Sequence, residues 1–226
     1  MKVIISSYGA VGGPKTRQMG VDGFEMTPTP AGDFVIAGCR PHESRRYPGG
    51  SSIPWGAPLK EESGVVMVKV DGSWQPVTKF VGVTKEDLIQ AYEALFAGMG
   101  LPKTWVFNSF GSNACYFFAD TNKNGRLDGK EKVRNEFFHT TLPNESATAL
   151  GQEVELEVSH GCIHLKPADM LEMVRRGYLK RGTRLTIHPY SVETIPFPRR
   201  EGGKPPYHVH VFPGAFKVVV VGELKF

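Results

Sequence analysis

Residues Ser159–His164, with the sequence SHGCIH, place a cysteine directly after a glycine and between two histidines. An isolated cysteine thiol has a pKa of about 8.5, so a nucleophilic cysteine needs a neighbouring base or positive charge. Gly161 permits the tight turn that presents such a side chain and brings backbone N–H groups close to a substrate oxygen. The stretch predicts that Cys162 is an activated nucleophile; the alternative is a buried structural thiol.

Two other segments lie at informative distances from this cysteine. His139 comes upstream and is followed by two threonines, and Thr27–Ile36 has the sequence TPTPAGDFVI. Together the three segments resemble the L,D-transpeptidase family, the YkuD-type catalytic domain of bacterial cell-wall enzymes. Its signature is a histidine, a spacer (here 142–158), then Ser/Thr-His-Gly-Cys, with a Thr-Pro-x-Gly-x-Phe segment near the start. The resemblance is recognisable over about 24–187.

The resemblance implies an acyl-transfer reaction on peptidoglycan stem peptides. The Cys162 thiolate would attack the carbonyl of the third stem residue, expel the terminal D-alanine and leave a thioester. An amine from another stem would resolve the thioester to a cross-link, and water would make the enzyme an L,D-carboxypeptidase. Two further alternatives stay open: an effector delivered into a competitor's envelope, and a non-catalytic, calcium-stabilised binding protein.

The resemblance also suggests roles for the residues around the cysteine. His139 would take the thiol proton, and the backbone carbonyl of Thr140 would orient its ring. His160 stays open as a rival base or as part of the pocket lining. Ser159 is expected to brace the turn, and the N–H groups around Gly161 and the cysteine to form an oxyanion hole.

His164 departs from the family pattern. Members have arginine or asparagine two residues after the cysteine, where the side chain shapes the site and meets a substrate carboxylate. We expect His164 to bind substrate there with a charge that depends on pH near neutrality. Arginines in the long loop 40–60 are candidates for the missing charge, although solvated surface is the simpler role for each: Arg40, Arg45 and Arg46.

Residues Asp120–Glu131, with the sequence DTNKNGRLDGKE, match the loop of an EF-hand. Side-chain oxygens at positions one, three, five and nine, glycine at six and glutamate at twelve suit Ca²⁺. The expected ligands are Asp120, Asn122, Asn124, the carbonyl of Arg126, Asp128 and Glu131. A strand precedes the loop, so the entering helix is missing, and 132–137 is expected to form a short exiting helix. The alternative is a surface turn without an ion.

Short runs of β-branched and aromatic residues between glycines and prolines predict a mainly β fold with a few helices. We expect a YkuD-like β-sandwich or open barrel in a catalytic domain over 1–190, then a connector and C-terminal β-hairpin over 191–226, packed on the same domain. One helix follows Thr84, and a second starts at Pro167 and buries Leu171 and Val174. Strands are expected over 3–6, 34–37, 65–70, 105–107, 115–118, 154–158, 185–188, 208–212 and 217–221.

The net charge and the lengths of the apolar runs limit the kinds of partner that we expect. A net charge of +4 over 226 residues, without a long basic tract, does not indicate nucleic-acid binding. No apolar run approaches the length of about twenty residues that a membrane span needs, and the N-terminal apolar run is too short for a secretory leader. The family resemblance implies the cell envelope or periplasm by an unknown export route, and the oligomeric state is open.

Two sets of residues leave alternatives open. Cys39 and Cys115 are either a disulfide in an oxidising compartment or two buried small hydrophobic residues. His208 and His210 share one strand face, which is compatible with a metal pair but lacks a visible third ligand.

Overall fold

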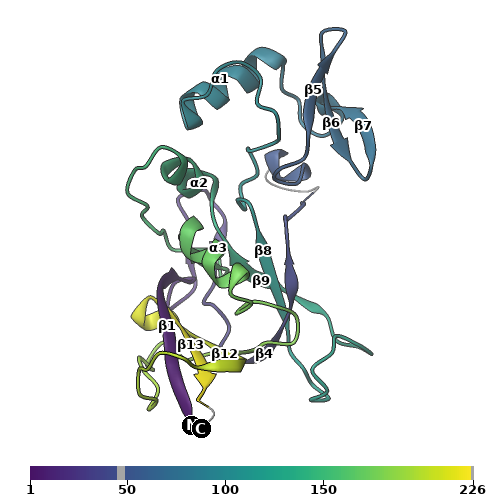
Figure 1. The fold of residues 1–226 in the computed structure, drawn as a ribbon. Helices are drawn as coiled ribbons and strands as arrows, with labels where there is room; N and C mark the ends of the chain where they lie inside the picture. Colours follow the sequence, from purple (N-terminus) through teal and green to yellow (C-terminus); the bar gives the residue numbers. More distant parts are fainter. Residues whose placement is uncertain (45–48, 225–226) are drawn as a thin grey trace. The chain divides into compact units, whose positions relative to one another are not determined.

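The computed structural model describes residues 1–44 and 49–224. The contacts divide the chain into two compact units (Figure 1). The first unit comprises Met1–Cys39, Cys115–His139 and Leu156–Phe226, and the second comprises Arg40–Ala114 and Thr140–Glu155. The second unit therefore consists of two insertions into the chain of the first.

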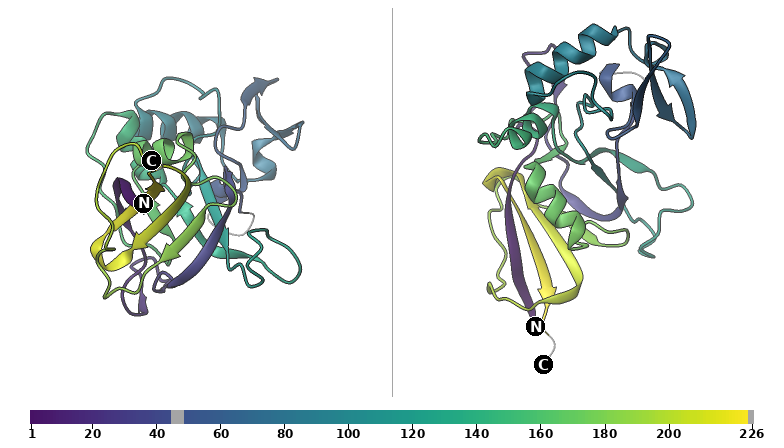
Figure 2. Two further views of the ribbon diagram at one scale, coloured as in Figure 1. Left: turned by 60° about the horizontal axis from the view of Figure 1, so that its bottom comes forward. Right: turned by 45° about the horizontal axis from the view of Figure 1, so that its top comes forward.

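The first unit is built around a closed barrel of eight strands in the order β1-β10-β9-β8-β4-β11-β12-β13. Neighbours pair antiparallel at β1–β10, β1–β13, β4–β11 and β12–β13, but β9–β10 and β11–β12 are parallel. Figure 2 shows β1 alongside the C-terminal strands. The strands are β1 (Lys2–Val11), β4 (Gly32–Arg40), β8 (Ala114–Phe118), β9 (Val133–His139), β10 (Ile163–Leu165), β11 (Arg184–Ile187), β12 (Lys204–Phe212) and β13 (Lys217–Glu223).

The barrel interior holds the main hydrophobic core. Alternate residues of the strands point inward, among them Phe138 of β9 and Ile163 of β10, both fully buried. Helix α3 (Pro167–Arg175) adds Met170 and Met173 to this core. A small hairpin of β2 (Gln18–Met19) and β3 (Glu25–Met26) and the 3-10 turn η3 (Pro213–Ala215) complete the unit.

The second unit has its own smaller core around Trp105. It contains a three-stranded antiparallel sheet and two helices, of which α1 is capped by Thr84 and Asp87 in a reciprocal capping box. The elements are η1 (Gly49–Ser52), β5 (Leu59–Glu62), β6 (Val65–Val70), β7 (Ser73–Pro76), η2 (Val77–Lys79), α1 (Lys85–Phe96) and α2 (Leu142–Ala149).

The mainly β prediction is confirmed, and several expected elements are wrong. The segment 105–107 forms isolated hydrogen bonds with Gly56 and Ala57 instead of a strand ladder. The segment 154–158 is no strand either, since the carbonyl of Glu157 accepts a bond from a histidine side chain. The expected helix over 132–137 is strand β9, because its aromatic residues pair with β10. Helix α3 buries its methionines, and Leu171 is 53% exposed.

Two of the three cysteines form a disulfide. Cys39 at the end of β4 is bonded to Cys115 at the start of β8, with a sequence separation of 76. These strands are neighbours in the barrel. The bond therefore joins the two places where the chain leaves the first unit and returns to it, which decides between the two alternatives for this pair.

Candidate active site

The cysteine turn lies at the edge between two parallel strands. Ile163 and His164 of β10 are in register with Phe138 and His139 of β9. Because side chains alternate across a strand, the core positions Phe138 and Ile163 leave His139, His164 and Cys162 on the opposite, outer face of the barrel wall. The fold therefore brings together the cysteine and two of the three predicted histidines.

Cys162 is the free cysteine of the described chain and is half-buried. Burial raises the pKa of the Cys162 thiol to about 12; the backbone N–H of Phe137 opposes the rise and the Glu136 carboxylate adds to it. A rise of this direction favours the neutral thiol at pH 7. To act as a nucleophile, Cys162 would therefore need a base that removes its proton.

Two histidine rings pack against one another beside the cysteine. The rings of His139 and His164 have centroids 4.6 Å apart and cross edge to face, and both residues are buried. His164 Nδ1 lies 2.9 Å from the carbonyl oxygen of Glu157, so Nδ1 carries the proton and Nε2 keeps its lone pair. Burial lowers the pKa of His164, which favours the neutral ring at pH 7.

Ser159 braces the turn, as expected. Its hydroxyl donates to the Cys162 carbonyl at 2.5 Å and accepts from the Gly161 N–H at 3.0 Å. Gly161 has a φ of +122°, a conformation that other residues rarely adopt. The Gly161 N–H, which was expected to donate to an oxyanion, is bonded to Ser159 in this structure.

Segments from the N-terminal part of the chain clamp this turn. The Ser159 N–H donates to the Gly12 carbonyl at 3.0 Å, and the Gly13 N–H donates to Thr29 Oγ1 at 2.8 Å. Thr27 Oγ1 donates to the His160 carbonyl at 3.0 Å. A Cβ on Gly13 would lie 1.9 Å from the Thr27 carbonyl oxygen, so the segments approach too closely for any side chain there. The Thr27–Ile36 segment thus supports the turn directly.

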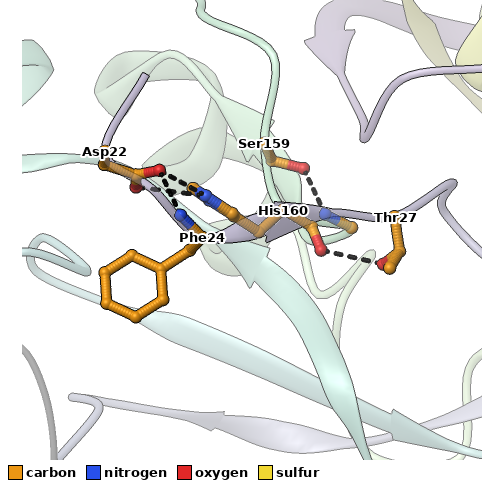
Figure 3. Close-up of polar contacts among 6 residues, drawn as sticks. Asp22, Phe24, Thr27, Ser159 and His160 are labelled. Atoms are coloured by element: carbon orange, nitrogen blue, oxygen red, sulfur yellow. Dashed lines mark hydrogen bonds and ion pairs between the residues drawn. The ribbon is translucent and has the colours of Figure 1, made fainter. Parts of the chain in front are cut away.

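His160 has a partner outside this cluster. Its Nε2 lies 3.1 Å from Asp22 Oδ2, and its side chain is 47% exposed (Figure 3). Asp22 also accepts the Phe24 N–H at 3.1 Å, and this bond, with His160, lowers the pKa of the Asp22 carboxyl. The β2–β3 hairpin therefore holds His160 in an ion pair. Sequence reasoning missed Asp22, because 138 residues separate it from its partner.

The remaining predicted residues have the following places. Thr140 is buried, and its hydroxyl donates to Glu145 Oε1 at 2.6 Å. Arg40 is exposed at the end of β4. Arg45 and Arg46 lie outside the described residues.

The chain matches the L,D-transpeptidase catalytic domain family, YkuD, over residues 3–187. It belongs to this family. Comparison with curated proteins and with solved structures finds no match. The matched region contains the cysteine turn, His139 and the Thr27–Ile36 segment, but it ends before β12 and β13. In this L,D-transpeptidase family member the last two barrel strands therefore come from sequence beyond the matched region.

The EF-hand-like loop closes on itself through its predicted ligands. Asp120 accepts the N–H groups of Asn124 and Gly125 at 3.1 and 2.9 Å, and Glu131 reaches back to the Thr121 N–H at 2.7 Å. The side-chain amides of Asn122 and Asn124 both donate to Asp128. The carbonyl of Arg126 belongs to the same loop. Positive φ angles at Lys123 and Gly125 produce the sharp turn.

The His208 and His210 face of β12 gains a third imidazole from His188. His188 Nε2 lies 3.0 Å from His210 Nδ1, and the His208 and His210 ring centroids are 4.0 Å apart. Within residues 1–44 and 49–224, no group of three or more His, Cys, Asp or Glu side chains is arranged to hold a metal ion. None of the helices in these ranges is long and apolar enough to cross a membrane.

Proposed function

We propose that this protein is a cysteine acyltransferase that acts on peptidoglycan stem peptides, with Cys162 as nucleophile. Family membership supports the substrate class. The observation that carries the proposal is the position of Cys162 on a glycine turn beside buried His139, on one face of two parallel strands. A purely structural thiol has no need of this arrangement.

His139 is the base in this mechanism. The thiol rests neutral, so His139 takes its proton as Sγ bonds to the carbonyl carbon of the third stem residue. The Cys162 N–H stabilises the oxyanion, because the Gly161 N–H is already bonded to Ser159. The intermediate collapses, the C–N bond to D-alanine breaks, and the leaving amine takes the proton from His139.

The thioester that remains is resolved by a second nucleophile. An amine of another stem attacks the thioester carbonyl, gives its proton to His139 and releases the Cys162 sulfur, which regains a proton. The product is a cross-link. Water in place of the amine gives the L,D-carboxypeptidase reaction, and an effector that trims a competitor's wall would use the same residues.

His160 and His164 have supporting roles. The ion pair with Asp22 fixes the His160 ring and thereby its backbone, which Thr27 also holds. His164 packs its ring against His139 and keeps that ring in place. Being neutral, His164 offers a substrate carboxylate no positive charge.

Intact-mass detection of a covalent carbapenem adduct tests the nucleophile. The wild-type protein is expected to gain the mass of one carbapenem, and Cys162→Ala is expected to gain none. Digestion of purified muropeptides then separates cross-linking from hydrolysis. Unchanged muropeptide profiles with wild-type protein, together with no adduct, would sink the enzyme proposal and leave the non-catalytic binding protein.

The cell envelope is the proposed location. Family members work on peptidoglycan, and disulfides such as Cys39–Cys115 form and persist in oxidising compartments. Cell fractionation with a thiol-trapping gel shift tests this. The oxidised form is expected in the envelope fraction.

We further propose that the loop Asp120–Glu131 binds a structural Ca²⁺. The N–H and O–H bonds from Thr121 and its neighbours overcome the effect of burial and lower the pKa of Glu131, so it is charged at pH 7. Glu131 Oε1 accepts from the N–H and the hydroxyl of Thr121 and from the Asn122 N–H, whereas Oε2 accepts only the Asp128 N–H and keeps a second lone pair for an ion. Ligation needs the Asn122 and Asn124 amides to turn their oxygens inward. The carboxylates of Asp120, Asp128 and Glu131 must also converge, since no three such groups among the described residues are arranged for a metal ion.

Thermal melting with Ca²⁺ and with chelator tests this site. Calcium is expected to raise the melting temperature, and Asp120→Ala with Glu131→Gln is expected to remove that rise. Because Glu131 lies two residues before β9, calcium is also expected to slow local hydrogen exchange in the strand that ends at His139. Equal melting and exchange in both conditions would contradict the proposal.

A further inference from the structure

A carboxylate lies next to the cysteine turn, on the neighbouring strand. The β9–β10 register, Phe138 with Ile163, places Glu136 opposite Gly161. A Cβ built on Gly161 would lie 3.5 Å from Glu136 Cγ, which confirms that the two residues touch. Glu136 is therefore one residue away from the position opposite Cys162, and along β9 it shares a strand face with Phe138 and not with His139.

Only one of the two oxygens of the Glu136 carboxylate has a hydrogen-bond partner within the described residues. Arg134 Nε is 3.0 Å from Glu136 Oε2, and the glutamate side chain keeps 21% of its surface exposed. Among residues 1–44 and 49–224, no group bonds to Glu136 Oε1. A partly buried carboxylate oxygen without a partner has lost part of its hydration and gains from a cationic donor.

The charge of Glu136 works against the nucleophile in the free protein. It adds to the burial that raises the pKa of the Cys162 thiol. A cation that binds to Glu136 would cancel this effect when substrate is present. The stem peptide that donates the acyl group and the stem that accepts it both carry a side-chain amine, which is an ammonium ion at neutral pH.

We propose that Glu136 is the ammonium-binding residue of the active site, and that its free oxygen receives the side-chain ammonium of a stem peptide beside Cys162. This inference rests on the proposed acyl transfer. The ammonium comes either from the acceptor stem or from the donor stem, and two experiments separate these sources. In both, Glu136→Gln keeps the shape and removes the charge.

The control is Glu172→Gln. Glu172 is also held by the Nε of one arginine, Arg176, at 2.6 Å, but it lies on α3 and takes no part in the proposed chemistry. We expect E172Q to behave as wild type in every measurement below. A general effect of losing one arginine-paired glutamate would appear in both variants.

The acceptor experiment uses the Cys162 thioester formed from the stem tetrapeptide L-Ala-γ-D-Glu-L-Lys-D-Ala. The thioester is resolved either by a second stem peptide with a free lysine amine or by hydroxylamine, which is uncharged at neutral pH. If the acceptor supplies the ammonium, it gives one proton to the Glu136 carboxylate and then attacks as the free amine, and E136Q raises KM for the amine peptide by about tenfold, the loss of one charge-assisted hydrogen bond. The rate with hydroxylamine stays unchanged.

The donor experiment compares the lysine tetrapeptide with its Nε-acetyl form as acyl donors, with water as acceptor. If the donor supplies the ammonium, wild type prefers the free amine by about tenfold and E136Q loses this preference. The pH profile of Cys162 alkylation by iodoacetamide is an independent readout. It moves to lower pH in E136Q, since the carboxylate no longer opposes thiolate formation.

The outcomes distinguish this inference from the proposed function. If wild type forms no thioester or carbapenem adduct on Cys162, the proposed function fails and the inference with it. If the thioester forms but E136Q matches E172Q in both the acceptor and donor experiments, the ammonium-binding role alone is overturned.

Discussion

Cys162 is a neutral thiol in the resting protein, so the identity of its base decides how the site works. The pKa of the thiol is raised to about 12, mainly by burial, which makes spontaneous ionisation rare at pH 7. Of the two predicted bases, His139 is buried on the same strand face, and His160 is half-exposed in an ion pair with Asp22. These surroundings favour His139 in the proposed mechanism.

Replacing each histidine by alanine tests this difference. His139→Ala is expected to lower the rate of Cys162 acylation by about 10²–10⁴-fold, the usual contribution of a general base. His160→Ala is expected to cost less, because it removes only a support of the turn. The readout is carbapenem adduct formation against time, with melting curves to confirm folding. A larger loss for His160→Ala would reverse the assignment.

At the scale of elements, three chain segments meet at the cysteine turn without room for side chains. Gly12 and Gly13 follow β1, the Thr27–Ile36 segment leads into β4, and the turn itself precedes β10. Gly13 lies in contact with both other segments, since its Cβ would come 3.1 Å from Gly161 Cα. The position of the nucleophile therefore depends on glycines that carry no chemistry.

Gly13→Ala is predicted to disturb the active site, whereas Gly9→Ala is not. The new methyl group of Gly13→Ala would meet the Thr27 carbonyl at 1.9 Å, but a Cβ on Gly9 in β1 has no neighbour within 4 Å. We expect Gly13→Ala to lose about 1–3 kcal/mol of unfolding free energy and most acylation activity. Denaturant unfolding and adduct formation check this. Equal unfolding free energies and equal adduct formation for Gly13→Ala and Gly9→Ala would contradict the proposed role of Gly13 in holding the cysteine turn.

The outer face of β11 and β12 carries a stack of neutral histidines. Thr186 donates to Asp33 Oδ1 at 2.6 Å and therefore accepts from His208 Nε2 at 2.9 Å. Burial lowers the pKa of His208 to about 4 and that of His210 to about 3, with Lys2 and neighbouring histidines adding to the shift and Asp33 opposing it. His210 Nε2 is buried without a partner among the described residues.

This face is predicted to make the protein acid-sensitive. An unfolded histidine has a pKa of about 6.5. Below that pH the histidines of the unfolded chain bind protons, whereas the same histidines in the folded protein stay neutral. Stability is full above pH 6.5 and falls as the pH drops towards about 4, where His208 protonates in the fold. His210→Phe is expected to flatten this fall in chemical unfolding at pH 7 and pH 5. If wild type and His210→Phe lose the same unfolding free energy between pH 7 and pH 5, this explanation is wrong.

At the scale of the whole molecule, closure of the barrel depends on distant parts of the chain. β13 pairs with β1, and β12 pairs in parallel with β11, so strands outside the matched family region complete the wall. The Cys39–Cys115 bond ties β4 to β8 at the junction with the second unit. Such a cross-link chiefly restricts the unfolded chain.

Removing this disulfide is predicted to cost about 2–4 kcal/mol of unfolding free energy, a typical value for a native disulfide. The Cys39→Ala/Cys115→Ala double variant avoids leaving a free thiol that competes with Cys162. Chemical unfolding of the variant and of wild type, with and without reductant, measures the loss. Reductant should destabilise wild type and leave the double variant unchanged; any other pattern would argue against the bond.

Sequence by itself determined the family and most strands, because these depend on local features. The SHGCIH turn, the β-branched runs and the Thr84 cap each act within a few neighbouring residues. Helix α2 was missed, since its start at Thr141 lies in the spacer and its sequence has little apolar periodicity. The parallel pairing of β9 with β10 was missed as well, because the sequence of a strand does not indicate which other strand it pairs with.

Only the tertiary structure decided how the site is completed. Pairing of β9 with β10 places Glu136 at Gly161 and His139 beside His164, and the β2–β3 hairpin brings Asp22 to His160. The Gly161 N–H is bonded to Ser159, and burial lowers the pKa of His164. Burial and partners set hydrogen bonds and charge states, and both arise only when segments far apart in the chain come into contact.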